Sequence, residues 1–283
     1  MEITELVTDP ARQAVISRRR RRDLIVASCS TVVFFGVIAV VVVTSPGWPA
    51  VKESFLNPVD ARSVFPSLVD GFWLTLKLFL TAEPVVLILA LLIAVLRGLT
   101  APIFAPLRIV ATLYTDIVRG VPTILLVYLF GFGIPALNLQ GVTNSAVFWG
   151  WAALVISYSA YVAEVFRAGL ESVHPSQVAA ARALGLNRFQ GLRYVVLPQA
   201  TRRVIPPLLN DFISLQKDTA LVSLLGVVEL MNAAQIYASF KFNFTPYVVA
   251  SLFFILLTVP MTRYADWIAD RQRRRSQTSG AGL

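Results

Sequence analysis

Cysteine and histidine are almost absent from this chain of 283 residues. Cys29 is its only cysteine and His174 its only histidine. One thiol excludes an intrachain disulfide, and so few thiols and imidazoles leave neither a set of zinc ligands nor a Ser/His/Asp arrangement. The sequence also contains no glycine-rich nucleotide loop of the Walker type. These absences argue against catalysis, so we expect the chain to be no enzyme.

Charged residues are scarce as well. They make up 14% of the chain, whereas hydrophobic residues make up 56% and the mean hydropathy is +0.69. Soluble domains carry about 25% charged residues, so this balance predicts an all-α integral membrane protein. Six apolar stretches approach the roughly 20 residues that cross a bilayer; they cover 24–44, 72–96, 107–131, 146–168, 204–225 and 247–268.

The first apolar stretch follows five consecutive arginines, Arg18 to Arg22, which is the layout of a secretory signal. Its apolar run is too long for a signal peptide, however, and Thr44-Ser45-Pro46 makes a poor cleavage site. We therefore interpret 24–44 as a retained span. The arginines then act as an anchor that keeps the N-terminus in the cytoplasm.

Lysine and arginine are distributed unevenly between the two sides of the membrane. With the N-terminus inside, 19 of the 25 fall in cytoplasmic segments and three fall outside, at Lys52, Arg62 and Lys241. An excess of positive charge is typical of cytoplasmic loops. The asymmetry predicts that both termini are cytoplasmic. It also explains the net charge of +9 without nucleic acid as a partner.

A polar segment between the fourth and fifth stretches predicts two short helices at a sharp angle. Helix formers run from Gln177 to Leu184, Gly185 is suited to close a helix, Asn187 can cap the next, and we expect Pro198 to end it. Five arginines hold the segment on the cytoplasmic side, at positions 182, 188, 193, 202 and 203, while Ala179, Ala183 and Leu184 offer a small apolar knob to a partner. The alternative is an amphipathic loop that lies on the lipid surface.

This segment reads Ala179-Ala180-Ala181-Arg182-Ala183-Leu184-Gly185, and nine residues later Val195-Val196-Leu197-Pro198. It resembles the EAA loop of ABC importer permeases in every spacing, although Ala179 replaces the glutamate of the pattern. Further motifs extend the resemblance over 68–268 to permeases of polar amino-acid importers of the histidine, glutamine and glutamate type. These motifs are Gly71-Phe-Trp-Leu-Thr75-Leu76, Arg119-Gly-Val-Pro122, Tyr158-Ser-Ala-Tyr161, Glu164-Val-Phe-Arg167-Ala-Gly169 and Lys217-Asp218-Thr219.

The resemblance implies a type I permease core of five helices, here with one extra N-terminal helix, in the bacterial plasma membrane. It implies a second permease subunit, identical or paralogous, and an extracytoplasmic substrate-binding protein. It also implies two ATPase subunits that hold ATP and magnesium, so that this chain needs no cofactor of its own. Coupling to the ATPase would involve Ala179, Ala180, Ala181, Arg182, Ala183, Leu184, Gly185 and Arg188.

Five segments follow from these patterns. We expect a basic cytoplasmic N-terminus (1–23), an accessory span (24–44), an extracytoplasmic linker (45–71) and a permease core (72–268) that contains the coupling loop (170–203). A cytoplasmic tail (269–283) ends the chain. The linker is expected to be a loop because it contains four prolines, and 226–246 is expected to face outward as well.

Charged residues within the spans are candidates for a substrate pathway. Asp116, Arg119, Lys217 and Asp218 fall near mid-membrane and Glu164 and Arg167 in the inner half, where each charge must be paired or face a cavity. Asp116 and Arg119 are spaced i, i+3, as are Glu164 and Arg167, so each pair can bridge itself or line a pathway. Gly120 and Pro122 directly follow the first pair and should loosen the helix there. Lys217 and Asp218 point about 100° apart, so at least one should reach another helix.

Charges of both signs at one depth suit a zwitterion, for which the candidates are Asp116, Arg119, Glu164, Lys217 and Asp218. The substrate is expected to be a polar amino acid, and another small zwitterion such as an opine, an osmolyte or an amino-acid derivative stays open. A secondary transporter driven by an ion gradient is a further alternative. It should show an inverted repeat with broken helices, and we find no convincing repeat.

Overall fold

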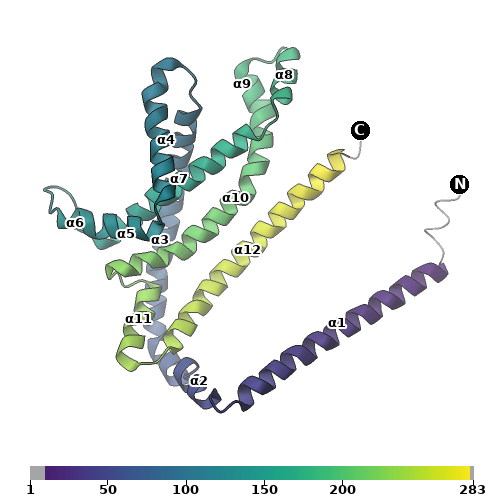
Figure 1. Cartoon of the computed structure of the whole chain (residues 1–283), viewed down its shortest axis with the longest axis vertical. Coiled ribbons are helices and arrows are strands. Elements are labelled where there is room, and N and C mark those ends of the chain that lie inside the picture. The colour runs from purple at the N-terminus through teal and green to yellow at the C-terminus, as the bar shows by residue number, and fades with distance from the viewer. Residues whose placement is uncertain (1–9, 281–283) are drawn as a thin grey trace. The chain divides into compact units, whose positions relative to one another are not determined.

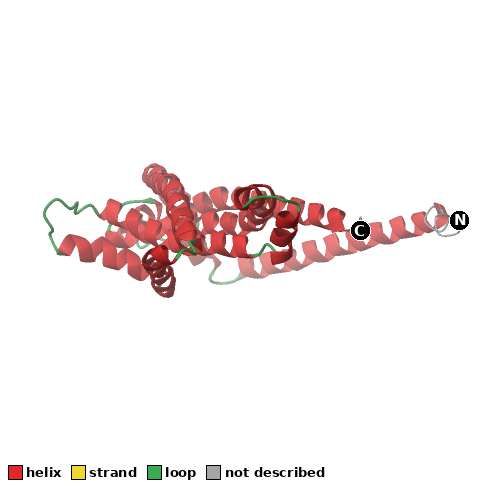
Figure 2. Ribbon diagram, turned by 90° about the horizontal axis from the view of Figure 1, so that it is seen from above, coloured by secondary structure: helices red, strands yellow, loops and turns green. Residues whose placement is uncertain are grey.

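Figure 1 shows the computed structural model, which describes the backbone of residues 10–280 and the side chains of 21–272. Helices account for all the regular secondary structure in the described part of the chain (Figure 2). The chain divides after Leu56 into two units, which are described separately. Arginines 12, 18 to 20 and 273 to 275, which carry part of the predicted inward charge, lie outside the described side chains.

The N-terminal unit consists of α1 (Pro10–Thr44) and α2 (Trp48–Phe55). The apolar part of α1, Arg21–Thr44, has no buried residues within the structure. A helix that is apolar on all sides is stable only in lipid or in a protein core, so α1 has the properties of a membrane span. Two residues of the predicted linker, Trp48 and Pro49, begin α2, where proline suits the first helical turn.

The second unit is built around the contact of α3 (Pro58–Gly98) with α7 (Ala146–Glu171). Asn57 caps α3, because its side chain accepts a hydrogen bond from the backbone N–H of Val59 at 2.9 Å. The expected linker is therefore helical from Pro58 onward, and Val64 and Leu68 are buried against α11 and α12. Proline predicted a loop here, yet Pro58 occupies the first turn, where no N–H is needed.

The expected third span, 107–131, is broken. The helical segment Pro102–Gly120, which contains η2 (Pro102–Phe104) and α4 (Ala105–Gly120), meets Thr123–Ala136 at 104°. The second arm consists of α5 (Thr123–Tyr128), the π-helical turn η3 (Leu129–Gly133) and α6 (Ile134–Ala136). Val121 has extended backbone because the following Pro122 excludes the α conformation. The predicted loosening at this proline is thus a full bend.

The C-terminal half begins with α8 (Pro175–Ala183), α9 (Arg188–Gly191), the π-helical turn η4 (Leu192–Val196) and α10 (Leu197–Asp218). It continues through η5 (Thr219–Leu225) and α11 (Leu230–Lys241) to α12 (Thr245–Gly280). The stretch 226–246, which is expected to face outward, is largely helical. Four described helices are long and apolar enough to cross a membrane, or up to six if each bent pair forms one span.

The Gly71-to-Thr75 motif holds α11 against α3. A Cβ atom on Gly71 would lie 2.8 Å from the carbonyl carbon of Glu229, so only glycine permits this approach. The Thr75 hydroxyl lies 3.1 Å from the Glu229 carboxylate and accepts the Leu230 N–H at 3.3 Å. Glu229 is fully buried and caps α11 by accepting the Asn232 N–H at 2.9 Å. This part of the motif therefore serves helix packing.

Candidate functional site

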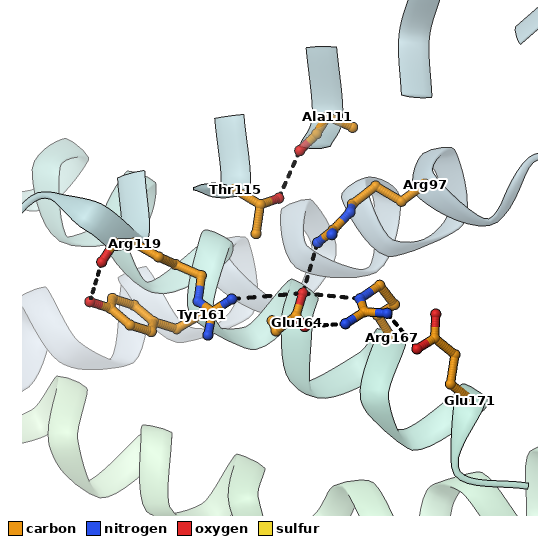
Figure 3. A network of polar contacts seen from close by, with 8 residues as sticks. All are labelled: Arg97, Ala111, Thr115, Arg119, Tyr161, Glu164, Arg167 and Glu171. Atoms are coloured by element: carbon orange, nitrogen blue, oxygen red, sulfur yellow. Dashed lines mark hydrogen bonds and ion pairs between the residues drawn. The ribbon is translucent and has the colours of Figure 1, made fainter. Parts of the chain in front are cut away.

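Glu164 on α7 is the centre of an ion-pair network that joins three helices (Figure 3). Arg97, from the end of α3, donates a hydrogen bond to its carboxylate at 2.9 Å. Arg167, one turn along α7, donates to both of its oxygens and also contacts Glu171. The predicted pairing of Glu164 with Arg167 along one helix face is therefore present, but it is only one part of a larger network.

Arg119 is the third arginine of this network, and the least tightly held. Its guanidinium lies 3.8 Å from the Glu164 carboxylate, compared with 2.9 Å for Arg97. Its side chain is 39% exposed, whereas that of Arg97 is 12% exposed. The guanidinium also lies 5.8 Å from the centre of the Tyr161 ring, and the Tyr161 hydroxyl donates to the Arg119 carbonyl at 3.4 Å. Arg119 is thus positioned by an aromatic ring more than by a close ion pair.

Asp116 does not pair with Arg119. On α4 the inward positions belong to Ala111, Thr115 and Val118, which are buried, and Asp116 is exposed. No ion pair joins Asp116 to another side chain in the described range 21–272. Of the two alternatives for Asp116, the bridge to Arg119 is therefore absent, and its position in a pathway stays a prediction. A helical step of about 100° separates it from the packed face at Thr115.

Asp218 reaches another helix, as its position beside Lys217 predicted. Its carboxylate accepts a hydrogen bond from the Tyr158 hydroxyl of α7 at 2.8 Å. Lys217 is exposed and forms no ion pair within the described side chains. One residue earlier, Gln216 is fully buried and accepts the Thr258 hydroxyl of α12 at 2.8 Å. The end of α10 therefore bonds to both α7 and α12.

Two tyrosines connect these groups along α7. The rings of Tyr158 and Tyr161 lie 6.3 Å apart, centre to centre. Tyr158 binds Asp218 and Tyr161 contacts Arg119, so a series of polar and ring contacts runs from Asp218 through the tyrosine pair and Arg119 to Glu164. We call this series of five residues the α7 polar row. Asp116 and Lys217, expected beside the others, form no ion pair with it among the described residues.

Sequence reasoning missed three polar residues near this row. Glu83 of α3 and Asp211 of α10 interact electrostatically, and one Asp211 carboxylate oxygen is buried without a hydrogen bond. Arg97 was placed in a cytoplasmic segment and not beside Glu164. Isolated charges in the apolar runs were the available signal for Glu83 and Asp211. For Arg97 no signal existed, because its partner is 67 residues away.

The coupling segment folds as a tight hairpin of α8 and α9. His174 caps α8 by accepting the Ser176 N–H at 3.2 Å, and Gly185 ends the turn with φ of +80°. Asn187 and Gln190 form a reciprocal capping box at the start of α9. The predicted glycine closure and asparagine cap are both present. The hairpin lies at the same end of the second unit as the connection between α3 and α4 (Figure 1).

Pro198 does not end the second helix, contrary to expectation. Helical backbone continues from α9 through η4 into α10, and Pro198 lies in the first turn of α10. A proline interrupts a regular helix because it lacks an N–H and its ring meets a carbonyl of the preceding turn. The π-helical turn just before it shifts the hydrogen-bond pattern. In addition, the Gln199 amide donates to the Val195 carbonyl at 3.0 Å.

The hairpin exposes most of the residues predicted to face an ATPase. Leu184 is 82% exposed, and Ala179, Ala180, Arg182, Ala183, Gly185 and Arg188 are exposed as well. Ala181 is the exception, because it is buried within the hairpin. Phe189, which was not among the predicted residues, is 67% exposed. The expected knob of Ala179, Ala183 and Leu184 is therefore accessible, and Ala181 supports it from inside.

Charges between apolar helices cost free energy unless they are paired or line a route for polar solutes, so fold and site together define a membrane permease. The chain belongs to the family described as binding-protein-dependent transport system inner membrane components, whose model matches residues 94–274. Permeases of this kind are multi-pass inner-membrane proteins that act with ATPase subunits and substrate-binding proteins. The chain is thus a transport subunit of an ABC importer and not a catalytic enzyme.

Two relatives from Bacillus subtilis (strain 168) illustrate the likeness. The chain is 33% identical to the probable glutamine ABC transporter permease protein GlnM over 73% of this chain and 94% of the relative. It is 29% identical to the arginine transport system permease protein ArtQ over 70% and 88%, respectively.

Two solved structures share the fold. The crystal structure of an amino acid ABC transporter with histidines matches with a TM-score of 0.68 at 32% identity, over 77% of this chain and 98% of that chain. An inward-facing structure of the MetNI methionine ABC transporter matches with a TM-score of 0.58 at 21% identity, over 72% and 95%, and shows the fold alone. The helices α1 and α2 precede the residues that the family model matches.

Proposed function

We propose that this permease subunit imports a polar amino acid across the bacterial plasma membrane, with both termini in the cytoplasm. The observation that carries the proposal is the α7 polar row, which presents a carboxylate and a guanidinium within one permease core. The amino-acid permeases and the amino-acid transporter to which the chain is similar support the same substrate class.

Arg119 is the group best suited to receive the substrate carboxylate. Its ion pair with Glu164 is the longest of the three, and Arg97 and Arg167 continue to neutralise Glu164 when Arg119 turns away. Release of Arg119 therefore leaves no unpaired charge behind, which would otherwise be costly. A planar guanidinium then binds the carboxylate through two parallel hydrogen bonds.

Asp218 is the complementary group for the substrate ammonium. The Tyr158 hydroxyl holds one oxygen of its carboxylate, which fixes its orientation and leaves the other for a cation. Asp116 and Lys217, which are exposed in the single chain, face the pathway on the side that a second permease subunit completes. That partner is an identical or paralogous chain.

The conformational change of transport involves the bend after Gly120 and the exposed hairpin. The two arms of the broken span meet at 104°, and Val121 and Pro122 form a short hinge that changes angle with few broken hydrogen bonds. The exposed residues of the segment Ala179 to Gly185, together with Arg188, contact an ATPase subunit that binds ATP and magnesium, and Ala181 supports them from inside. Closure of the two ATPases draws the hairpins together and opens the pathway toward the substrate-binding protein.

The accessory span and its flanking segments complete the proposed organisation. The helix α1 anchors the chain in the membrane, α2 lies in the extracytoplasmic segment, and the residues after 268 form a cytoplasmic tail. Apolar surface that α1 exposes is covered by membrane lipid.

The test is uptake by vesicles that contain the permease with its ATPase and substrate-binding protein. Labelled polar amino acids should accumulate only when ATP is present on the side of the membrane that carries the ATPase. Unlabelled substrate should reduce the uptake of the labelled amino acid. Uptake driven by an ion gradient without ATP would contradict the proposal. Competition by an opine or osmolyte, with none by any amino acid, would contradict the substrate class.

A further inference from the structure

A pocket of about 410 Å³ lies inside the coupling hairpin and is separate from the α7 polar row. It is enclosed by α8, by α9 with η4, and by the segment that follows α3. Its lining residues are Thr100, Val178, Ala181, Arg182, Leu186, Asn187, Arg188, Gly191, Leu192 and Val196. The volume is within the range of about 300–1,000 Å³ typical of small-molecule sites.

The lining of the pocket combines basic side chains with apolar ones. Arg182 and Arg188 are its charged residues, and Thr100 and Asn187 add neutral hydrogen-bonding groups. Neither arginine forms an ion pair with another side chain in the described range 21–272. No acidic residue contributes to the lining. An anion that also carries some apolar surface would therefore satisfy both parts.

The pocket is at the border between apolar and polar surroundings. Thr100 follows the end of α3 by two residues, and the turns of that helix before Arg97 are strongly apolar. Arg108 donates to the Leu99 carbonyl at 2.9 Å, which fixes this connection. In the proposed topology the pocket therefore faces the inner leaflet at the depth of the lipid headgroups.

We propose that this pocket binds the phosphate of an anionic phospholipid headgroup. The two guanidinium groups pair with the phosphate oxygens, and the apolar part of the lining contacts the glycerol backbone and first acyl carbons. Basic pockets between helices on the cytoplasmic side commonly bind such headgroups. The assignment rests on the proposed cytoplasmic placement of the hairpin.

A phospholipid headgroup in this pocket would stiffen the hairpin that contacts the ATPase. Arg182 lies on α8 and Arg188 on α9, on opposite sides of the turn at Gly185. A phosphate between them bridges the two helices and neutralises their mutual repulsion. The inner-leaflet lipid would then support coupling, since α8 and α9 move as one body.

The test measures lipid association with the full chain alone, without the ATPase. The permease is placed in phosphatidylcholine vesicles that contain spin-labelled phosphatidylglycerol, and the fraction of immobilised label is recorded. The variant Arg182→Gln/Arg188→Gln is compared with Arg193→Gln/Arg202→Gln, which removes the same charge from the same segment outside the pocket. We expect association to fall about tenfold in the first variant and at most about twofold in the control.

Equal losses of lipid association in the two double-glutamine variants would overturn the proposal, because they would show that phosphatidylglycerol responds to the total surface charge and not to the pocket. Unchanged lipid association in Arg182→Gln/Arg188→Gln would overturn the pocket outright. The variant Arg182→Lys/Arg188→Lys keeps both positive charges, so retained association in it shows that substitution at these two positions does not unfold the hairpin. If inorganic phosphate protects the hairpin from proteolysis in pure phosphatidylcholine and phosphatidylglycerol has no effect, the ligand is free phosphate and not a lipid headgroup. Because no ATPase is present, these outcomes are independent of the uptake assay.

Discussion

Tyr158 of α7 donates its hydroxyl hydrogen bond to Asp218 at the end of α10, across 2.8 Å. The two residues are 60 positions apart, and their bond ties one end of the polar row to the helix that continues from the coupling hairpin. In the proposed mechanism, substrate binding and ATPase contact act on the same element, α10.

Asp218→Asn should reduce uptake about tenfold or more while basal ATP hydrolysis stays unchanged. An amide accepts the Tyr158 hydrogen bond but offers no negative charge to an ammonium group, and a charge-assisted hydrogen bond contributes about 1.5–3 kcal/mol. The measurement is the ratio of uptake to hydrolysis in vesicles, normalised to inserted protein. An unchanged ratio would show that Asp218 serves helix packing only.

Arg97→Ala should mainly lower the stability of the subunit, whereas Arg119→Ala should mainly lower uptake. Arg97 is largely buried and forms the shorter bond to Glu164, so its loss should destabilise the subunit by about 2–3 kcal/mol. Arg119 is more exposed and more distant, so its loss should cost less than about 1 kcal/mol in stability but should impair uptake. Thermal unfolding and uptake of the two variants, measured side by side, distinguish these roles. Similar unfolding temperatures together with similar uptake would refute the division.

Gly71→Ala should lower the stability of the core by about 1–3 kcal/mol, the cost of overpacking a close helix contact. The added Cβ would lie 2.8–2.9 Å from backbone atoms of Glu229 and Leu230, which cannot move independently. Gly133→Ala is the control, because nothing lies within 4 Å of the Cβ it adds. Thermal unfolding in detergent measures both. A drop confined to Gly133→Ala would contradict this packing account.

Gly185→Pro and Ala183→Asp should uncouple ATP hydrolysis from transport while leaving the subunit inserted. Gly185 has φ of +80°, which proline cannot adopt, and the Ala183→Asp change places a negative charge on the exposed apolar knob. Gln177→Ala, at an exposed position earlier on α8, is the control. Substrate-stimulated hydrolysis at the wild-type level in Gly185→Pro would count against the coupling role.

Cysteine labelling should place the hairpin on one side of the membrane and both α2 and the end of α11 on the other. Lys52→Cys and Ser239→Cys, both at exposed positions, should react from outside, and Gln177→Cys should react only after permeabilisation. The background is Cys29→Ser. Asn243 is a poor site for this purpose because it is buried. The reverse pattern would exclude the proposed orientation.

Local features of the coupling hairpin were predictable from the sequence. Gly185 and Asn187 determine where α8 ends and α9 begins through interactions that span only a few residues. Hydropathy likewise identified the apolar segments, since lipid requires long apolar runs. The bend after Gly120 was anticipated only as a softened helix, because the angle between two arms depends on what each arm packs against.

Tertiary structure alone decided which charges meet. Both Asp116 and Glu164 have the spacing for an ion pair with an arginine three residues along, but only Glu164 forms it. Arg119 instead faces Glu164, 45 positions away, because α4 packs its Val118 face on α7 and leaves Asp116 exposed. Sequence spacing determines the partners within one helix, whereas partners between helices depend on how the helices pack, which local sequence does not specify.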